Sequence, residues 1–235
     1  MSAHVLAAGG GTRPEWAPDP RRDGLRGFAR IEDDRAGSHP GVPHIRALGT
    51  MWRFDVHHPR DVDTYPDRQR QEVAGMRVGG RERRAAEGET WRFAWSWYLT
   101  GALRATTSFT HVHQQFAVGA GPVLAISLRR RGGRDTIELN ALHAGVLVGS
   151  GELAPLRGRW STVELEIRYA AEGRVRWRVT DDAGRTVADA ARDGLATWHG
   201  AAGVAPKWGI YRSLKDSARL TDAHLLLKDV RAHRR

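Results

Sequence analysis

Cysteine is absent from this chain of 235 residues, so it contains no disulfide bridge and no thiolate metal site. No apolar run approaches the roughly 20 residues that a membrane-spanning helix needs, and we expect no membrane partner. The first 13 residues contain no charged stretch followed by an apolar core. We therefore expect no secretory signal within this chain.

Acidic residues are fewer than basic ones. Lysine and arginine number 37, aspartate and glutamate 27, and the formal net charge is +10. Such an excess favours an anionic partner (nucleic acid, acidic polysaccharide or an anionic surface), with a plain solvated basic surface as the alternative. Hydrophobic residues make up 40% of the chain, which is ordinary for a globular domain and argues against disorder.

Short strands dominate the part of the chain that has a hydrophobic pattern. Residues 1–22 are rich in glycine, proline and arginine, which predicts a flexible tail. Residues 23–235 alternate apolar and polar positions, most clearly in Trp91–Leu99 and Ser161–Tyr169. Further strands are expected over Met51–His57, Arg68–Met76, Thr107–Phe116, Val123–Leu128, Thr136–Ala141, Val146–Val148, Arg174–Thr180, Trp208–Arg212 and His224–Ala232. The pattern predicts one all-β domain, a sandwich or barrel, with at most a helical turn or two in Asp189–Trp198.

Most of the nine tryptophans lie at alternating strand positions, where core packing explains them better than a ligand platform. Trp52 and Trp208 are less certain, because each flanks a polar cluster.

Three predicted strands carry an unusual density of polar side chains. In the first, Arg68, Arg70 and Glu72 point the same way because side chains alternate across a strand. In the second, Gln114 lies on one face, while His111 and His113 share the other.

The third polar strand is Pro206–Arg212, which aligns Lys207, Gly209 and Tyr211 on one face. A glycine between these two side chains leaves room for a ligand to approach the backbone. The outer faces of antiparallel strands are normally polar, which accounts for any one of the three strands. Planar donors on all three instead indicate a face that binds planar or anionic groups.

These three segments resemble strands of the jelly-roll polysaccharide lyases. Asp-Arg-Gln-Arg-Gln-Glu-Val at 67–73 is similar to their arginine–glutamate strand, and Phe-Thr-His-Val-His-Gln at 109–114 to their glutamine-bearing strand. Pro-Lys-Trp-Gly-Ile-Tyr-Arg at 206–212 is similar to their lysine–glycine–tyrosine strand. The resemblance spans Pro43 to Ala232 and is nearest to family 20, the endo-β-1,4-glucuronan lyases, with heparin lyase I and the alginate lyase jelly-rolls more distant. One departure is Phe116, where relatives are expected to have lysine or histidine, and it bears on the substrate more than on the fold.

The resemblance implies a β-jelly-roll sandwich of two antiparallel sheets with a concave substrate groove. It implies a monomeric polysaccharide lyase that cleaves a uronic-acid polymer, most simply β-1,4-glucuronan, by β-elimination and leaves an unsaturated uronate end. An extracellular or periplasmic location follows from the same resemblance. The chemistry needs no cofactor, although a structural calcium ion held by carboxylates such as Asp229 would suit a jelly roll.

Such an elimination has three tasks: neutralising the C6 carboxylate, removing H5 and protonating the departing O4. Gln114 and Arg70 suit the first, because an amide and a guanidinium donate to a carboxylate in its plane. Tyr211 suits the other two, since nearby positive charge favours a phenolate, and H5 and O4 of a β-D-glucuronate lie on the same side of the ring. His57 is the candidate helper base. The candidates for substrate binding are Arg68, Lys207, His111, His113 and Arg212.

Each assignment has a structural alternative. Tyr211 also fits an edge tyrosine bonded to backbone, His57 a surface histidine, and Arg70 a partner of Glu72. The alternate-residue pair of His111 and His113 is a possible metal site, but no matching carboxylate motif lies nearby, so the pattern assigns no metal ligand.

Three rival functions remain at this point. A non-catalytic carbohydrate-binding module would use the same face but has no need of a phenol beside a cation. A nucleic-acid-binding protein would explain the charge, yet the chain shows no stacked-aromatic RNA signature and no recognition helix, so no nucleic-acid partner is expected. A glycoside hydrolase needs two facing carboxylates, and only Glu72 is well placed.

Overall fold

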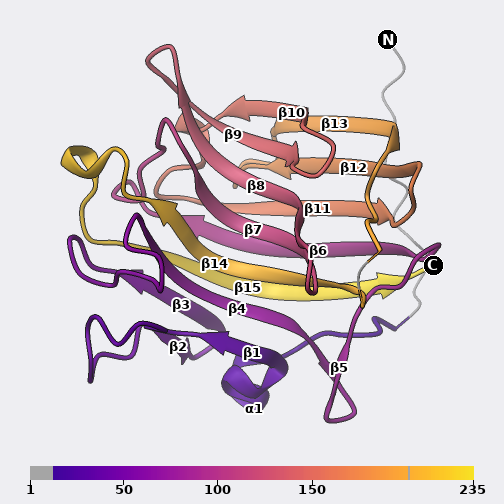
Figure 1. Ribbon diagram of the computed structural model, residues 1–235, viewed down its shortest axis with the longest axis horizontal. Helices are drawn as coiled ribbons and strands as arrows, with labels where there is room; N and C mark the ends of the chain where they lie inside the picture. The colour runs from indigo at the N-terminus through magenta and orange to yellow at the C-terminus, as the bar shows by residue number, and fades with distance from the viewer. Residues whose placement is uncertain (1–12, 201) are drawn as a thin grey trace.

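The computed structural model describes residues 13–200 and 202–235. Most of this part is strand, and the strands form two antiparallel sheets that pack on each other as a jelly-roll sandwich (Figure 1). None of the helices in these described residues is long and apolar enough to cross a membrane. The predicted all-β class is confirmed.

One sheet has eight strands and carries the polar segments identified from the sequence. Its order is β1-β4-β14-β7-β8-β9-β10, with the short β5 paired to β4. Figure 1 shows β4, β14 and β7 side by side in its middle, although these strands are far apart in sequence. The bounds are β1 Phe28–Glu32, β4 Arg68–Val78, β5 Arg81–Arg83, β7 Thr110–Ala117, β8 Gly121–Arg131, β9 Arg134–Ala141, β10 Val146–Glu152 and β14 Val204–Ser213.

The other sheet has seven strands in the order β13-β12-β11-β6-β15-β3-β2. Its central strands are long, and their buried side chains alternate with more exposed ones along much of their length. The bounds are β2 Ile45–Leu48, β3 Met51–Val56, β6 Thr90–Leu99, β11 Trp160–Arg168, β12 Gly173–Thr180, β13 Thr186–Leu195 and β15 Ala223–Arg234. The helical turn expected in Asp189–Trp198 is wrong, because most of that segment belongs to strand β13, which pairs with β12.

The core lies between the two sheets and is rich in indole rings. On β6, Phe93 lies opposite Leu165 of β11 and Trp95 opposite Val163, so the apolar positions of neighbouring strands share one buried face. Trp95 also meets Trp208 of the facing sheet, with ring centroids 5.8 Å apart. The fully buried tryptophans are Trp52, Trp91, Trp95, Trp97, Trp177 and Trp208, which places both uncertain cases in the core.

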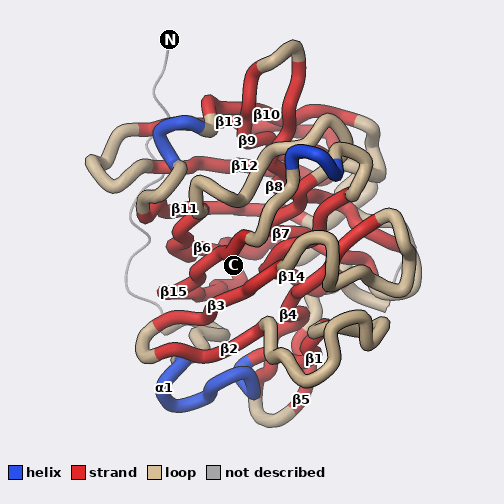
Figure 2. Tube along the Cα trace, turned by 90° about the vertical axis from the view of Figure 1, so that its left-hand side faces the viewer, coloured by secondary structure: helices blue, strands red, loops and turns tan. Residues whose placement is uncertain are grey.

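The N-terminal segment joins this core. Trp16 is buried, stacks on Trp208 at 5.6 Å and donates its indole N–H to the carbonyl of Gly27 at 3.1 Å. Helix α1, Pro20–Asp23, follows and lies beside β2 at the edge of the sandwich (Figure 2). The flexible tail expected over 1–22 is therefore wrong for residues 13–22. Residues 1–12 lie outside the described part.

The short helical turns that remain are η1 (Gly24–Gly27), η2 (Ala154–Leu156) and η3 (Ser217–Arg219).

Candidate active site

Tyr211 lies on β14 and points away from the core, because its neighbours Ile210 and Arg212 occupy the alternate, inward positions. It is 9% exposed. Arg68, 143 positions earlier in the chain, donates from Nη1 to the phenolic oxygen at 2.6 Å. The guanidinium carbon of Arg70 lies 3.8 Å from the centroid of the Tyr211 ring. Two cations therefore surround this phenol, one at its oxygen and one on its face.

Arg70 also binds three carboxylates. Its Nε donates to Asp63 at 3.0 Å, and its Nη1 to Glu32 at 3.0 Å and Glu72 at 3.2 Å. Burial opposes the positive charge, but Glu72, Glu32 and the other neighbouring anions outweigh it and raise the pKa of Arg70. The structural alternative for Arg70, a partner of Glu72, thus describes part of its role. No described residue accepts a hydrogen bond from Nη2.

Gln114 of β7 is positioned by Glu72. Its amide nitrogen donates to Glu72 Oε1 at 2.7 Å, and both side chains are almost fully buried. Burial raises the pKa of Glu72, and the charges of Lys207 and Arg70 oppose that rise only in part. The amide group of Gln114 is therefore held in one orientation on the face that carries Tyr211.

Lys207 lies on the same face as Tyr211 and is neutralised by Glu32. Its ammonium group lies 2.6 Å and 2.8 Å from the two carboxylate oxygens of Glu32 and 3.8 Å from Glu72. It also lies 4.7 Å from the ring centroid of Phe116, the residue that departs from the family pattern. Burial raises the pKa of Glu32, but Lys207 and Arg70 more than offset this and leave it lowered.

His111 and His113 face opposite sides of the sheet, contrary to the simple alternation expected for them. The ring of His111 lies 5.8 Å from that of Tyr211, whereas His113 packs in the core against Trp95 at 4.5 Å. A register shift between the two histidines in the β7–β8 pairing separates them. Such bulges re-aim side chains. The two imidazoles therefore do not form the metal pair considered from the sequence.

His111 is held by Ser127, whose Oγ lies 2.6 Å from its Nδ1, and stacks on Phe109 at 4.8 Å. Burial, together with the charges of Arg129 and Arg70, lowers the pKa of His111 to about 3. His111 is thus an uncharged imidazole beside Tyr211 at neutral pH.

Two predicted substrate ligands lie on the wrong side of the sheet. Arg212 is fully buried, donates from Nε to Gln69 at 2.7 Å and from Nη2 to the carbonyl of Thr221 at 3.1 Å. Burial lowers its pKa to about 10. His113 lies in the core. Neither side chain can contact a polymer on the outer face, which corrects both assignments.

Gly209 is required by strand packing rather than by a ligand. Its φ is +141°, and a Cβ at this position would overlap the carbonyl oxygen of Gln71 on the paired strand. The close approach is between β14 and β4.

His57 does not join Tyr211. It follows β3, and its ring contacts Asp61, His39 and His44; the nearest of these is a distance of 2.9 Å from Nδ1 to Asp61 Oδ2. Among the described residues, none of its hydrogen bonds or ring contacts reaches the outer face of the eight-stranded sheet. His57 therefore has no place as a helper base in this geometry.

The sequence-based reasoning missed Glu32 and Asp63, the acids that hold Arg70 and Lys207. Glu32 ends β1, directly opposite Glu72 in the register. The alternation of Arg30 and Glu32 in the first strand was the available signal. Asp63 lies in a loop, where alternation gives no information.

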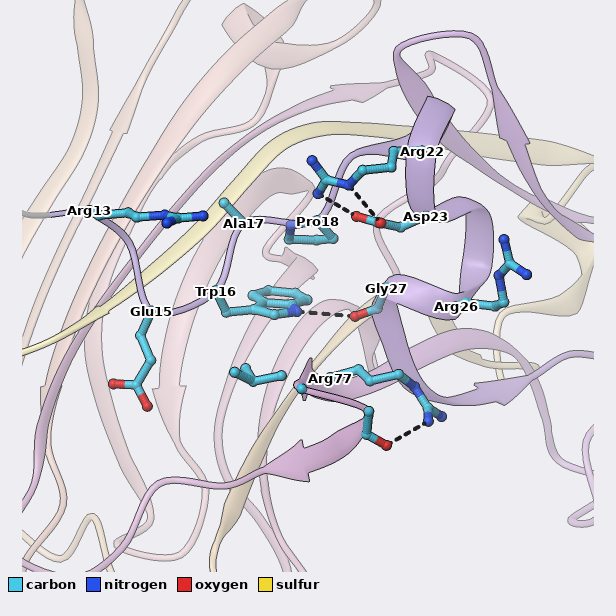
Figure 3. A pocket seen from close by; sticks show the side chains of 13 residues that line it. Arg13, Glu15, Trp16, Ala17, Pro18, Arg22, Asp23, Arg26, Gly27 and Arg77 are labelled. Atoms are coloured by element: carbon cyan, nitrogen blue, oxygen red, sulfur yellow. Dashed lines mark hydrogen bonds and ion pairs between the residues drawn. The ribbon is translucent and has the colours of Figure 1, made fainter.

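A separate pocket of about 400 Å³ lies near the N-terminal segment (Figure 3). Arginine side chains surround it, and Arg22 forms an ion pair with Asp23 at 2.8 Å. The lining residues are Arg13, Glu15, Trp16, Ala17, Pro18, Arg22, Asp23, Arg26, Gly27, Arg77, Val78, Gly79 and Gly80. The candidate residues Tyr211, Gln114 and Arg70 are not among them.

No family model and no curated protein sequence matches the chain. Solved structures do match. A family 7 alginate lyase, A1-II′, in complex with product has a TM-score of 0.61 at 11% identity, over 94% of this chain and 100% of that chain. An endo-β-1,4-glucuronan lyase from the fungus Trichoderma reesei has a TM-score of 0.58 at 15% identity, over 94% and 95%. The family 7 alginate lyase AlgAT5 has a TM-score of 0.56 at 13% identity, over 84% of each chain. The chain thus has the jelly-roll fold of these polysaccharide lyases, as its three polar strands led us to expect.

Proposed function

We propose that this protein is a polysaccharide lyase that cleaves a uronic-acid polymer by β-elimination on the outer face of its eight-stranded sheet. The observation that carries the proposal is the environment of Tyr211. Arg68 donates to its oxygen at 2.6 Å, and Arg70 covers its ring at 3.8 Å. A sugar-binding module has no use for a phenol held between two guanidinium groups. A proton-transfer catalyst does, because these charges stabilise a phenolate oxygen.

The proton route in this proposal uses one side chain. The Tyr211 phenolate removes H5, the C5–H electron pair forms the C4=C5 double bond, and the C4–O4 bond breaks. The phenol then returns the same proton to O4. A single group can do both only when H5 and O4 lie on the same side of the ring, as in a β-D-glucuronate. We therefore propose β-1,4-glucuronan as the substrate.

The C6 carboxylate of the substrate must be neutralised so that charge can develop at C5. We assign this task to Gln114, whose second amide hydrogen remains available, and to the Nη2 group of Arg70. His111 is an uncharged imidazole next to Tyr211 and can donate from Nε2 to the same carboxylate. Lys207 acts more indirectly: by neutralising Glu32 it keeps Arg70 from being surrounded by unpaired anions.

The test is a panel of glucuronan, alginate, heparin, hyaluronan and xanthan. It is read by the ultraviolet absorbance of the new double bond conjugated to the carboxylate, with products sized by mass spectrometry. We expect the largest signal on glucuronan. Preference for guluronate blocks of alginate, where H5 and O4 lie on opposite sides, would contradict the single-residue route and point to His111 as a second group. Binding without any unsaturated product would leave the carbohydrate-binding alternative.

A further inference from the structure

Three histidines and one aspartate meet at one end of the sandwich, outside the face that carries Tyr211. They are His39, His44, His57 and Asp61, called here the His–Asp cluster. His39 and His44 come from the loop between β1 and β2, and His57 and Asp61 from the loop between β3 and β4. One possible ligand atom from each of the four lies within 4.8 Å of the others.

Three of the separations between these atoms are close to those expected around a single tetrahedral metal ion. Two ligands about 2.05 Å from a zinc ion at the tetrahedral angle lie about 3.3 Å apart. His44 Nε2 and His39 Nδ1 are 3.4 Å apart, and they lie 3.0 Å and 2.8 Å from Asp61 Oδ1. His57 Nδ1 is 2.9 Å from Asp61 Oδ2. The three rings stand 5.1–5.4 Å from one another, all directing a nitrogen at Asp61.

An outer carboxylate orients the most buried of these ligands. His44 is fully buried, and its second nitrogen, Nδ1, lies 2.8 Å from Asp33 Oδ1. The backbone N–H groups of His44 and Ile45 also donate to Asp33. This is the carboxylate–histidine–metal arrangement, in which the outer acid fixes the tautomer and presents the other nitrogen to the metal.

Both nitrogens of a fully buried imidazole thus face carboxylate oxygens, one on each side. A metal ion on the Asp61 side would take Nε2 of His44 as a ligand, while Nδ1 stays in contact with Asp33.

The donor set selects the metal. Three imidazole nitrogens favour zinc and its transition-metal neighbours over calcium, which takes oxygen ligands. Four protein ligands around one point also fit a closed structural zinc site rather than a catalytic one with an open position. The structural calcium ion expected from the family resemblance stays a prediction, and this cluster is not its site.

We propose that the His–Asp cluster binds one Zn²⁺ ion, with His39, His44, His57 and Asp61 as ligands and Asp33 as the orienting outer carboxylate. The ion would tie together the β1–β2 and β3–β4 loops, because each loop supplies two of the four ligands. One contact must give way: Arg60 Nη1 lies 3.4 Å from His39 Nε2, and this exposed, flexible side chain turns to solvent when Nε2 carries the proton.

The test uses the full chain without an affinity tag, stripped of metal by a chelator and then titrated with Zn²⁺ by calorimetry and with Co²⁺ by visible spectroscopy. We expect one Zn²⁺ per chain, a Co²⁺ spectrum of four-coordinate intensity, and a rise in melting temperature with added Zn²⁺. His39→Ala removes a partly exposed ligand and should weaken binding at least about 100-fold. Asp33→Asn keeps all four ligands and should weaken binding about 10- to 100-fold.

His143→Ala is the matched control. His143 stacks on His199 with ring centroids 4.1 Å apart, and among the described residues this is the other pair of histidine rings in contact outside the His–Asp cluster. It should leave the zinc affinity unchanged. If His44→Ala does not fold, the zinc affinities of His39→Ala and Asp33→Asn still test the proposal. Equal affinity in wild type and His39→Ala, loss of binding in His143→Ala, or only millimolar binding in every form would overturn the proposal. None of these readouts depends on lyase activity.

Discussion

Replacing Tyr211 by phenylalanine tests the proposed chemistry most directly. The substitution removes one hydroxyl group and keeps the ring on which Arg70 stacks. Arg68 loses one acceptor but keeps its pairing with Asp67, at 2.6 Å and 2.8 Å. We therefore expect the free energy of unfolding to fall by about 0.5–1.5 kcal/mol, the net value of one hydrogen bond.

The catalytic loss should be far larger. If Tyr211 performs both proton transfers, kcat should fall by at least about 100-fold, the lower end of what a positioned acid–base group contributes. KM should change little, because Gln114 and Arg70 still face the substrate carboxylate. The assay is the initial rate of double-bond absorbance on the best polymer of the panel, with urea unfolding to confirm the fold.

Tyr65→Phe provides a matched control. Tyr65 is also covered by Arg68, with the guanidinium carbon 4.9 Å from its ring centroid, but it is 61% exposed. The Tyr65→Phe variant should keep the wild-type kcat. If Tyr211→Phe retains more than about a tenth of wild-type kcat, the loss is too small for an acid–base residue and Tyr211 is not the catalyst.

Three further predictions follow from the same contacts. Gln114→Ala should raise KM and lower kcat together, because the amide would bind the substrate carboxylate in ground and transition states. It should also reduce the free energy of unfolding by about 1–3 kcal/mol, since buried Glu72 loses a hydrogen-bond donor. Unchanged kinetics would contradict the assignment. Rising NaCl should raise KM on a polyuronate while kcat stays level. Arg70 and Lys207 are already paired with carboxylates, so the attraction comes from the net charge of +10, which salt screens over about 8–10 Å. A KM that does not change with NaCl would mean that the net charge plays no part in binding. Burial lowers the pKa of His113 from 6.5 to about 3, so between these values the unfolded chain binds a proton that the folded chain does not. The free energy of unfolding should therefore fall as pH decreases through this range, and it should fall less steeply in His113→Gln. Parallel plots of this free energy against pH for the two proteins would refute the prediction.

The fold could be read from the sequence because burial on one face enforces a period of two. Trp91–Leu99 and Ser161–Tyr169 show that period plainly and form the centre of the seven-stranded sheet. Residues 189–198 misled because small and charged residues alternate weakly at an edge: β13 is the last strand of its sheet and carries few buried side chains. Its strand state is set by pairing with β12, which no local pattern records.

The expectation of a flexible tail at residues 13–22 is wrong for a related reason. Glycine, proline and arginine around Trp16 are typical of disorder, yet a single indole ring packed against Trp208 and Phe28 anchors the segment. Local composition averages over many residues, whereas one buried aromatic side chain contributes enough apolar area to order the few residues around it.

The candidate site was only partly accessible to the same reasoning. Alternation correctly placed Arg68, Arg70, Glu72, Lys207 and Tyr211 on one face, because β4 and β14 are regular where they meet. The acids that complete the network come from other places: Glu32 from an edge strand and Asp63 from a loop. Ion pairs between distant segments depend on tertiary register, and the sequence does not contain that register in any local form.

The most informative difference from expectation is the orientation of His111, which strict alternation places on the same face as His113. His111 lies where the strand pairing is irregular. Register shifts occur between His111 and His113 in the β7–β8 pairing, and between Trp208 and Tyr211 in the β14–β7 pairing. With strict alternation His111 would share the core side with His113, and the phenol would have no imidazole beside it. The bulge turns His111 outward to 5.8 Å from the ring of Tyr211 while His113 stays packed between Trp95 and Trp208. Departures of this kind concentrate at functional sites, because they place a side chain where a regular strand cannot. The point at which the simple rule breaks is thus itself an argument that the face around Tyr211 has been shaped for chemistry.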